Sequence, residues 1–82
     1  MDIQLEILSP EKTIYKGKVS SIRVPGSLGD FTVLQYHAPI ISTLEKGKIK
    51  IEEQGGNPEY FDIEGGIVEV HKNKAIILAE EP

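Results

Sequence analysis

The sequence offers few side chains that could catalyse a reaction or hold a metal ion. His37 and His71 are the only histidines, cysteine is absent, and the two histidines are too far apart for a short zinc motif. Ser27, Asp30 and His37 lie close together in the sequence, but no nucleophile-elbow pattern accompanies them. Turn chemistry therefore explains the serine better than a hydrolase triad does.

The glycine-rich segments 26–29 and 65–66 are poor candidates for binding phosphate. Neither has the spacing G-x-x-x-x-G-K-[ST], and neither precedes a predicted helix whose N-terminus could hold an anion. The acidic residues are typical of a solvated face, and no pair of them can be assigned glycosidase geometry from the sequence. We therefore expect no metal, no cofactor, no tight ATP binding and no enzymatic activity.

Length and composition favour one small soluble domain and exclude several classes of partner. The chain has 82 residues, of which 39% are hydrophobic and 27% charged, and it lacks the cysteines that stabilise small secreted domains. Its net charge of −4 disfavours binding to nucleic acid. The longest apolar run, residues 75–79, is too short to cross a membrane, so we expect no direct membrane insertion.

Polar and apolar residues alternate along most of the chain, as they do in half-buried strands. The clearest examples are residues 2–7 and 48–52, and Gly-rich or Pro-rich turn signals recur about every ten residues. This pattern predicts an all-β protein, a flattened β-sandwich of about ten short strands in two sheets. We expect inward-facing side chains at Ile3, Leu5, Ile7, Val19, Phe31, Val33, Ile49, Ile51, Phe61, Ile63, Val68, Val70, Ile77 and Ala79.

Two segments depart from simple alternation. The apolar residues Val19, Ile22 and Val24 skip one position at Ser20-Ser21, as a β-bulge or a bent strand would require, and of the two we predict a bulge. The segment 25–39 places apolar side chains in two Gly/Pro-rich loops. Exposed apolar groups on such loops indicate a protein-binding surface, whereas the alternative is that they tuck under the end of the sandwich as part of the core.

The same segment carries a recognisable motif. Residues 24–40 read VPGSLGDFTVLQYHAPI, which resembles the signature V-P-G-x-x-G-x-[FIL]-G-V-L-P-x-H-A-P-[LI] of the epsilon subunit of F-type ATP synthase, called delta in mitochondria. LEILSPEK at residues 5–12, KGKIKI at 46–51 and GGIVEVHKNKA at 65–75 resemble other parts of the same family in the same order. The resemblance thus covers essentially the whole chain.

The resemblance implies a non-catalytic rotor subunit. Members of this family fold as a sandwich of two sheets of five strands each, pack on the gamma subunit in the central stalk and touch the polar loops of the membrane c-ring. They thereby couple proton translocation to ATP synthesis, as peripheral components on the cytoplasmic side of the inner (plasma) membrane. The alternative is a stand-alone β-sandwich adaptor that binds another protein or a carbohydrate.

The resemblance also implies a contact site for the c-ring. Asp30 matches the family's usually acidic loop position, Ser27, Leu28 and Gly29 lie beside it, and Tyr36 and His37 belong to a neighbouring loop that we expect near the same end. Alternatively, Asp30 only caps the turn before Phe31, as Asp commonly does.

Three residues depart from the family pattern. Thr32 stands where glycine is usual, and Gln35-Tyr36 stand where Pro-Gly is common. The family usually continues into a C-terminal helical hairpin that restrains ATP hydrolysis and binds ATP in some members, whereas this sequence stops at Pro82. We expect residues 1–82 to form one epsilon-type domain without the hairpin and without either property.

Overall fold

The structure is a computed structural model that describes residues 2–82, and within this range nine strands form two sheets and no residue lies in a helix. The strands are β1 (Ile3–Leu8), β2 (Thr13–Val19), β3 (Ser21–Val24), β4 (Phe31–Leu34), β5 (Ile40–Leu44), β6 (Gly47–Glu52), β7 (Pro58–Ile63), β8 (Gly65–His71) and β9 (Lys74–Glu80). The larger sheet has the order β2-β1-β9-β8-β5, and the smaller has the order β4-β3-β6-β7.

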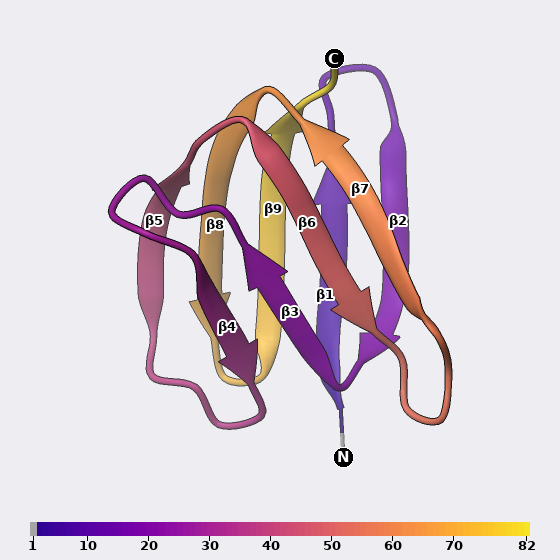
Figure 1. The fold of residues 1–82 in the computed structure, drawn as a ribbon. Helices are drawn as coiled ribbons and strands as arrows, with labels where there is room; N and C mark the ends of the chain where they lie inside the picture. Colours follow the sequence, from indigo (N-terminus) through magenta and orange to yellow (C-terminus); the bar gives the residue numbers. More distant parts are fainter. Residues whose placement is uncertain (1) are drawn as a thin grey trace.

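The two sheets lie face to face as two layers (Figure 1). All neighbouring strands are antiparallel except β1 and β9, which run parallel. The predicted all-β sandwich is therefore confirmed. The smaller sheet has four strands rather than the five that the resemblance implies, because the loop after β3 meets β5 only through an isolated bridge between Gly26 and Leu44.

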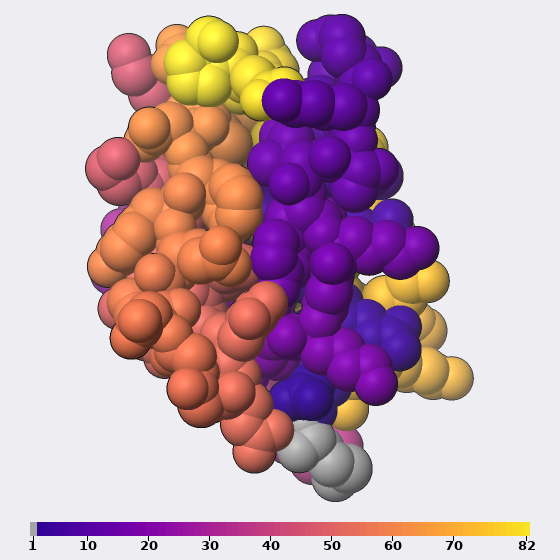
Figure 2. Space-filling model, turned by 90° about the vertical axis from the view of Figure 1, so that its right-hand side faces the viewer, coloured from indigo at the N-terminus to yellow at the C-terminus, as the bar shows by residue number. Residues whose placement is uncertain are grey.

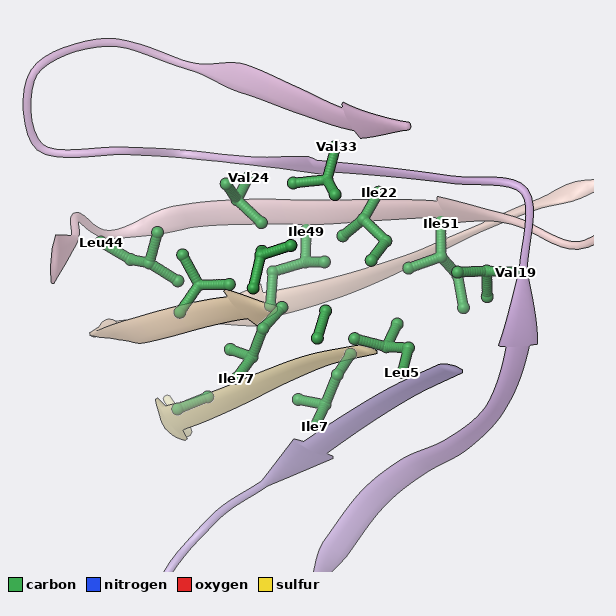
Figure 3. Packing of buried hydrophobic residues seen from close by; sticks show 14 of the residues in the cluster. Leu5, Ile7, Val19, Ile22, Val24, Val33, Leu44, Ile49, Ile51 and Ile77 are labelled. Carbon is green, nitrogen blue, oxygen red and sulfur yellow. The ribbon is translucent and has the colours of Figure 1, made fainter. Parts of the chain in front are cut away.

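The core is a single apolar layer between the sheets. Among residues 2–82 every fully buried side chain is hydrophobic, and Figure 3 shows these side chains converging from both sheets. Full burial of one such side chain stabilises the fold by about 1.5–3 kcal/mol. This layer fixes which residues of each strand face inward, and so also fixes which face outward.

The predicted core residues are buried, apart from the two phenylalanines. Phe31 and Phe61 are partly buried and pack against the rim of the core, because β4 and β7 are the edge strands of the smaller sheet. The prediction omitted four further core residues, which are Ile22, Val24, Leu44 and Ala75.

The predicted bulge at Ser20-Ser21 is wrong. The chain turns a corner there, since β2 ends at Val19 in the larger sheet and β3 begins at Ser21 in the smaller one. The inner faces of the two sheets point in opposite directions. The inward side chains are therefore odd-numbered at the end of β2, up to Val19, and even-numbered in β3, from Ile22, a shift of one position in the alternation. The Ser20 amide and hydroxyl both donate to the Glu52 carbonyl oxygen, at 2.7 and 2.9 Å, which pins the corner to the end of β6.

Tyr15 closes the side of the sandwich where the edge strands β2 and β7 run side by side (Figure 2). Its ring centroid lies 5.7 Å from that of Phe61, and its hydroxyl donates to Glu53 Oε2 at 2.6 Å. Burial, followed by the hydrogen bond and the charge of Glu53, raises the pKa of the Tyr15 phenol to about 12. The phenol therefore stays protonated and keeps this contact well above neutral pH.

Gly66 gives a direct test of how closely the strands of the larger sheet approach. A Cβ at Gly66 would collide with the Leu78 carbonyl oxygen and the Ala79 backbone, whereas a Cβ at Gly56 would make ordinary contacts, the nearest at 3.4 Å from Glu53 Cβ. We expect Gly66→Ala to lower the free energy of unfolding by about 1–3 kcal/mol and Gly56→Ala to change it by less than about 0.5 kcal/mol. Urea denaturation of both variants measures this, and equal stabilities would contradict the packing described.

Candidate interaction surfaces

The loop that carries Asp30 is held rigidly against the end of β5. Pro25 O accepts from the Glu45 amide at 2.8 Å, and the Ser27 amide donates to Thr43 O at 3.0 Å. The Thr43 hydroxyl donates to Ser27 Oγ at 2.8 Å. The loop therefore has a fixed shape that does not depend on a partner.

The tip of this loop is a tight turn closed by the Gly29 amide, which donates to Gly26 O at 2.9 Å. Gly29 has a φ of 129°, and a Cβ at Gly26 would lie 2.6 Å from Gly29 O, so both positions require glycine. Leu28 at the tip is fully exposed. Asp30 pairs with Arg23 at 3.6 Å, and no backbone amide within residues 2–82 donates a hydrogen bond to its carboxylate.

The second loop, which joins β4 to β5, begins with a β-turn whose third residue is unusual. The His37 amide donates to Leu34 O at 3.1 Å, and Tyr36, at the third position of this turn, has a φ of 65°. A type II turn needs a positive φ at that position and therefore favours glycine. Tyr36 thus adopts the backbone that the family's usual Gly would adopt, and its amide donates to Asn73 Oδ1 at 2.7 Å.

The expectation that the two loops lie near the same end of the domain is wrong. One precedes β4 and the other follows it, so they leave opposite ends of that strand. Both nevertheless border the side of the sandwich formed by β4 and β5 (Figure 1). The His37 ring reaches back along this side, with its centroid 6.4 Å from that of Phe31, and its Nδ1 lies 2.7 Å from Ala38 O.

The apolar residues of these loops face solvent, except Pro25 at the base of the first loop, which is buried. Leu28 and Tyr36 are exposed, and so are Ala38 and Pro39, which rules out the alternative in which they extend the core. Thr32, at the other departure from the family pattern, is an ordinary exposed residue of β4 opposite Arg23. The loops therefore present rigid, partly apolar tips.

Sequence reasoning missed a second surface, on the outer face of the larger sheet. Ile67, Leu78 and Leu8 are direct cross-strand neighbours on β8, β9 and β1, and we call them the apolar row. Ile67 and Leu78 are exposed, Leu8 is partly exposed, and Ile41 on β5 is exposed nearby. The row borders an open hollow of about 460 Å³ that also includes Pro10.

A signal for this surface was present in the sequence. The apolar runs Ile40-Ile41, Ile67-Val68 and Ile76-Ile77-Leu78 break the alternation, so at least one residue of each run must face outward. The outer face of the smaller sheet differs, because there Lys48 pairs with Asp62 at 2.7 Å and Lys50 with Glu52 at 3.6 Å. The exposed Leu34 and Tyr60 lie on the opposite edge strands β4 and β7 of the smaller sheet, so they form no continuous apolar row. The two outer faces therefore differ, because only the larger sheet brings its exposed apolar side chains together.

Among residues 2–82, no three His, Cys, Asp or Glu side chains gather in a way that could hold a metal ion. The same residues include no helix long and apolar enough to cross a membrane.

Comparisons with known proteins agree with the sequence motif. Residues 2–81 match the family described as ATP synthase, Delta/Epsilon chain, beta-sandwich domain. The chain is 38% identical over 78 residues to the ATP synthase epsilon chain of Chlorobium limicola, a match that covers 95% of this chain and 89% of that one. The ATP synthase epsilon chain of Chlorobaculum tepidum is 40% identical over 77 residues, which cover 94% of this chain and 88% of the relative.

Two solved structures show the same fold. The chain matches 51% of a chain in a cryo-EM structure of Euglena gracilis mitochondrial ATP synthase, with a TM-score of 0.92, 24% identity and 98% of this chain covered. It matches 65% of a chain in the central stalk/c-ring structure of Tetrahymena thermophila mitochondrial ATP synthase, with a TM-score of 0.82, 19% identity and 99% of this chain covered. This chain thus spans half to two thirds of those two chains.

The positive φ of Tyr36 gives a test of the second loop. Tyr36→Gly and Tyr36→Ala both remove the side chain, but only glycine adopts this backbone without strain. We expect the Gly variant to be more stable than the Ala variant by roughly 0.5–1 kcal/mol, after allowing for the greater freedom of glycine in the unfolded chain. Thermal and urea denaturation measure the difference, and an Ala variant as stable as the Gly variant would contradict the type II turn.

Proposed function

Because the chain belongs to the delta/epsilon family of ATP synthase subunits, it is an epsilon-type, non-catalytic subunit, and we propose that it links the gamma subunit to the c-ring in the central stalk. In this position it couples proton translocation to ATP synthesis without itself reacting with nucleotide. It is a peripheral component on the cytoplasmic side of the inner (plasma) membrane.

The exposed apolar row is the observation that carries this function, because it supplies a docking face for the gamma subunit. Exposed apolar side chains that lie together on a rigid sheet are a mark of protein interfaces. The paired charges on the outer face of the smaller sheet would be costly to remove from water. We therefore assign the gamma subunit to the outer face of the larger sheet.

The two loops along β4 and β5 supply the contact with the c-ring. Ser27, Leu28, Gly29 and Asp30 form the tip of one loop, and Tyr36 and His37 belong to the other. These loops lie at the side of the sandwich, so a partner there can be engaged while the larger sheet is covered. Asp30 makes polar contacts with the loops of the c-ring, and Leu28 adds apolar contact beside it. Tyr36 adds apolar contact from the loop at the other end of β4.

Replacement of Leu78 tests the docking face. Leu78→Asp places a charge in the apolar row, and we expect affinity for the purified gamma subunit to fall by about thirtyfold or more, the effect of losing an interface hot spot. Tyr60→Asp is the matched control, because Tyr60 is 56% exposed on the smaller sheet and Leu78 is 52% exposed on the larger. Surface plasmon resonance measures both. Equal affinity of the Leu78 variant and the native chain would contradict docking on this face.

Replacement of Asp30 tests the c-ring contact. The pair of Asp30 with Arg23 is exposed on both sides, so Asp30→Ala should cost at most about 1 kcal/mol of stability. We expect it to reduce proton-driven ATP synthesis in reconstituted vesicles, with Asp30→Lys more harmful if the facing loop is basic. Asp62→Ala, which removes an exposed ion pair elsewhere, should leave coupling unchanged. A large loss of thermal midpoint with intact coupling would instead assign Asp30 to the turn.

A further inference from the structure

Four lysines gather at one end of the larger sheet. On its outer face Lys18, Gln4 and Lys74 are direct cross-strand neighbours on β2, β1 and β9, with His71 of β8 opposite Lys74. Lys16 lies two residues before Lys18 on the same face, and Lys72 lies in the turn before Lys74. We call Lys16, Lys18, Lys72 and Lys74 the basic cluster.

The basic cluster differs from the rest of the positive charge on the molecule. Each of the other five basic side chains has a carboxylate within 4.0 Å, whereas no ion pair involves the basic cluster within residues 2–82. The paired residues are Lys12, Arg23, Lys46, Lys48 and Lys50. Carboxylates are not scarce, because the chain has thirteen acidic residues and a net charge of −4.

Unpaired like charges brought together in an acidic protein do not stabilise it. Only Gln4 separates Lys18 from Lys74, and Glu6 lies opposite Lys16 without forming an ion pair with it among residues 2–82. The positive charges therefore repel each other, and an approaching anionic group offsets this repulsion. Lys16, Lys18 and Lys74 border an open hollow of about 370 Å³, so three lysines face one acidic residue, Glu6, and the rest of its lining is uncharged: Gln4, Leu5 and Gly17. The arrangement therefore fits an external anionic group better than any role within the isolated chain.

The basic cluster and the apolar row share the outer face of the larger sheet. The apolar row crosses β8, β9 and β1 near one end, and the row formed by Lys18, Gln4 and Lys74 crosses β2, β1 and β9 near the other. Between them lies a mixed row that contains Glu69, Ile76 and Glu6. A partner that covers this face therefore meets apolar groups at one end and unpaired positive charge at the other.

We propose that the partner docked on the larger sheet carries a cluster of acidic side chains, which it places opposite Lys16, Lys18 and Lys74. This inference rests on the proposed docking of the gamma subunit. It adds that the surface of gamma in contact with the larger sheet is negatively charged. The apolar row supplies contact area, and the basic cluster sets the orientation and raises the rate of encounter, as complementary charges do at interfaces.

The test is the salt dependence of association with the purified gamma subunit. Stopped-flow or surface plasmon resonance measures the association rate constant between about 20 and 500 mM salt. The screening of charge–charge interactions changes strongly over this range. The variant K16Q/K18Q/K74Q removes three charges from the proposed interface. The matched control K46Q/K48Q/K50Q removes the same number of charges from β6 of the smaller sheet and the turn before it, where the lysines are already paired.

We expect the K16Q/K18Q/K74Q variant to associate about tenfold more slowly at low salt and to lose most of the salt dependence of the native chain. The control should stay within about twofold, since its charges lie on the opposite face. Circular dichroism and thermal midpoints confirm that both variants are folded.

Two results would overturn the inference and one would overturn its premise. Native-like rates and salt dependence in K16Q/K18Q/K74Q would show that the basic cluster does not face gamma. Binding of the native chain to phosphatidylglycerol vesicles, abolished by the same substitutions, would assign the cluster to lipid phosphates instead. Failure of the native chain to bind gamma at any salt concentration would contradict the proposed docking itself.

Discussion

The structure depends on the burial of one apolar face from each of two sheets against the other. Every fully buried side chain among residues 2–82 is hydrophobic, so the contact between the sheets is made by apolar side chains. The requirement explains the alternation of the strands and also the corner at Ser20, where the inward positions shift so that Val19 and Ile22 both reach the core. Because the inner faces are committed to packing, interaction chemistry is confined to the outer faces and the loops.

The outer surfaces of the domain differ in the contacts that they can make. The loops along β4 and β5 are fixed by hydrogen bonds to Thr43 and Asn73, so their tips have a defined shape without a partner. The smaller sheet presents paired charges, whereas the larger sheet presents the apolar row and the unpaired basic cluster. A rigid sandwich with three chemically different surfaces suits a subunit that contacts more than one neighbour in a rotating assembly, and it needs no catalytic group to do so.

Much of this fold could be predicted from sequence, because a half-buried strand shows its inward face as a period of two. Ile49 and Ile51 are an example, since their polar neighbours leave only one face to bury. The corner at Ser20 was misjudged because a bulge and a change of sheet skip one position in the same way. The apolar row and the basic cluster were missed because residues such as Leu8, Leu78, Lys18 and Lys74 become neighbours only through the pairing of β2, β1 and β9.

Docking of the gamma subunit on the outer face of the larger sheet can be tested by NMR titration of the ¹⁵N-labelled chain with unlabelled gamma subunit, in which the chain's amide signals are followed residue by residue. We expect the largest changes at outward-facing positions such as Ile67, Lys74 and Leu78, and little change at Lys48, Lys50 and Asp62 on the smaller sheet. Changes concentrated on the smaller sheet, with the larger sheet unaffected, would contradict this docking.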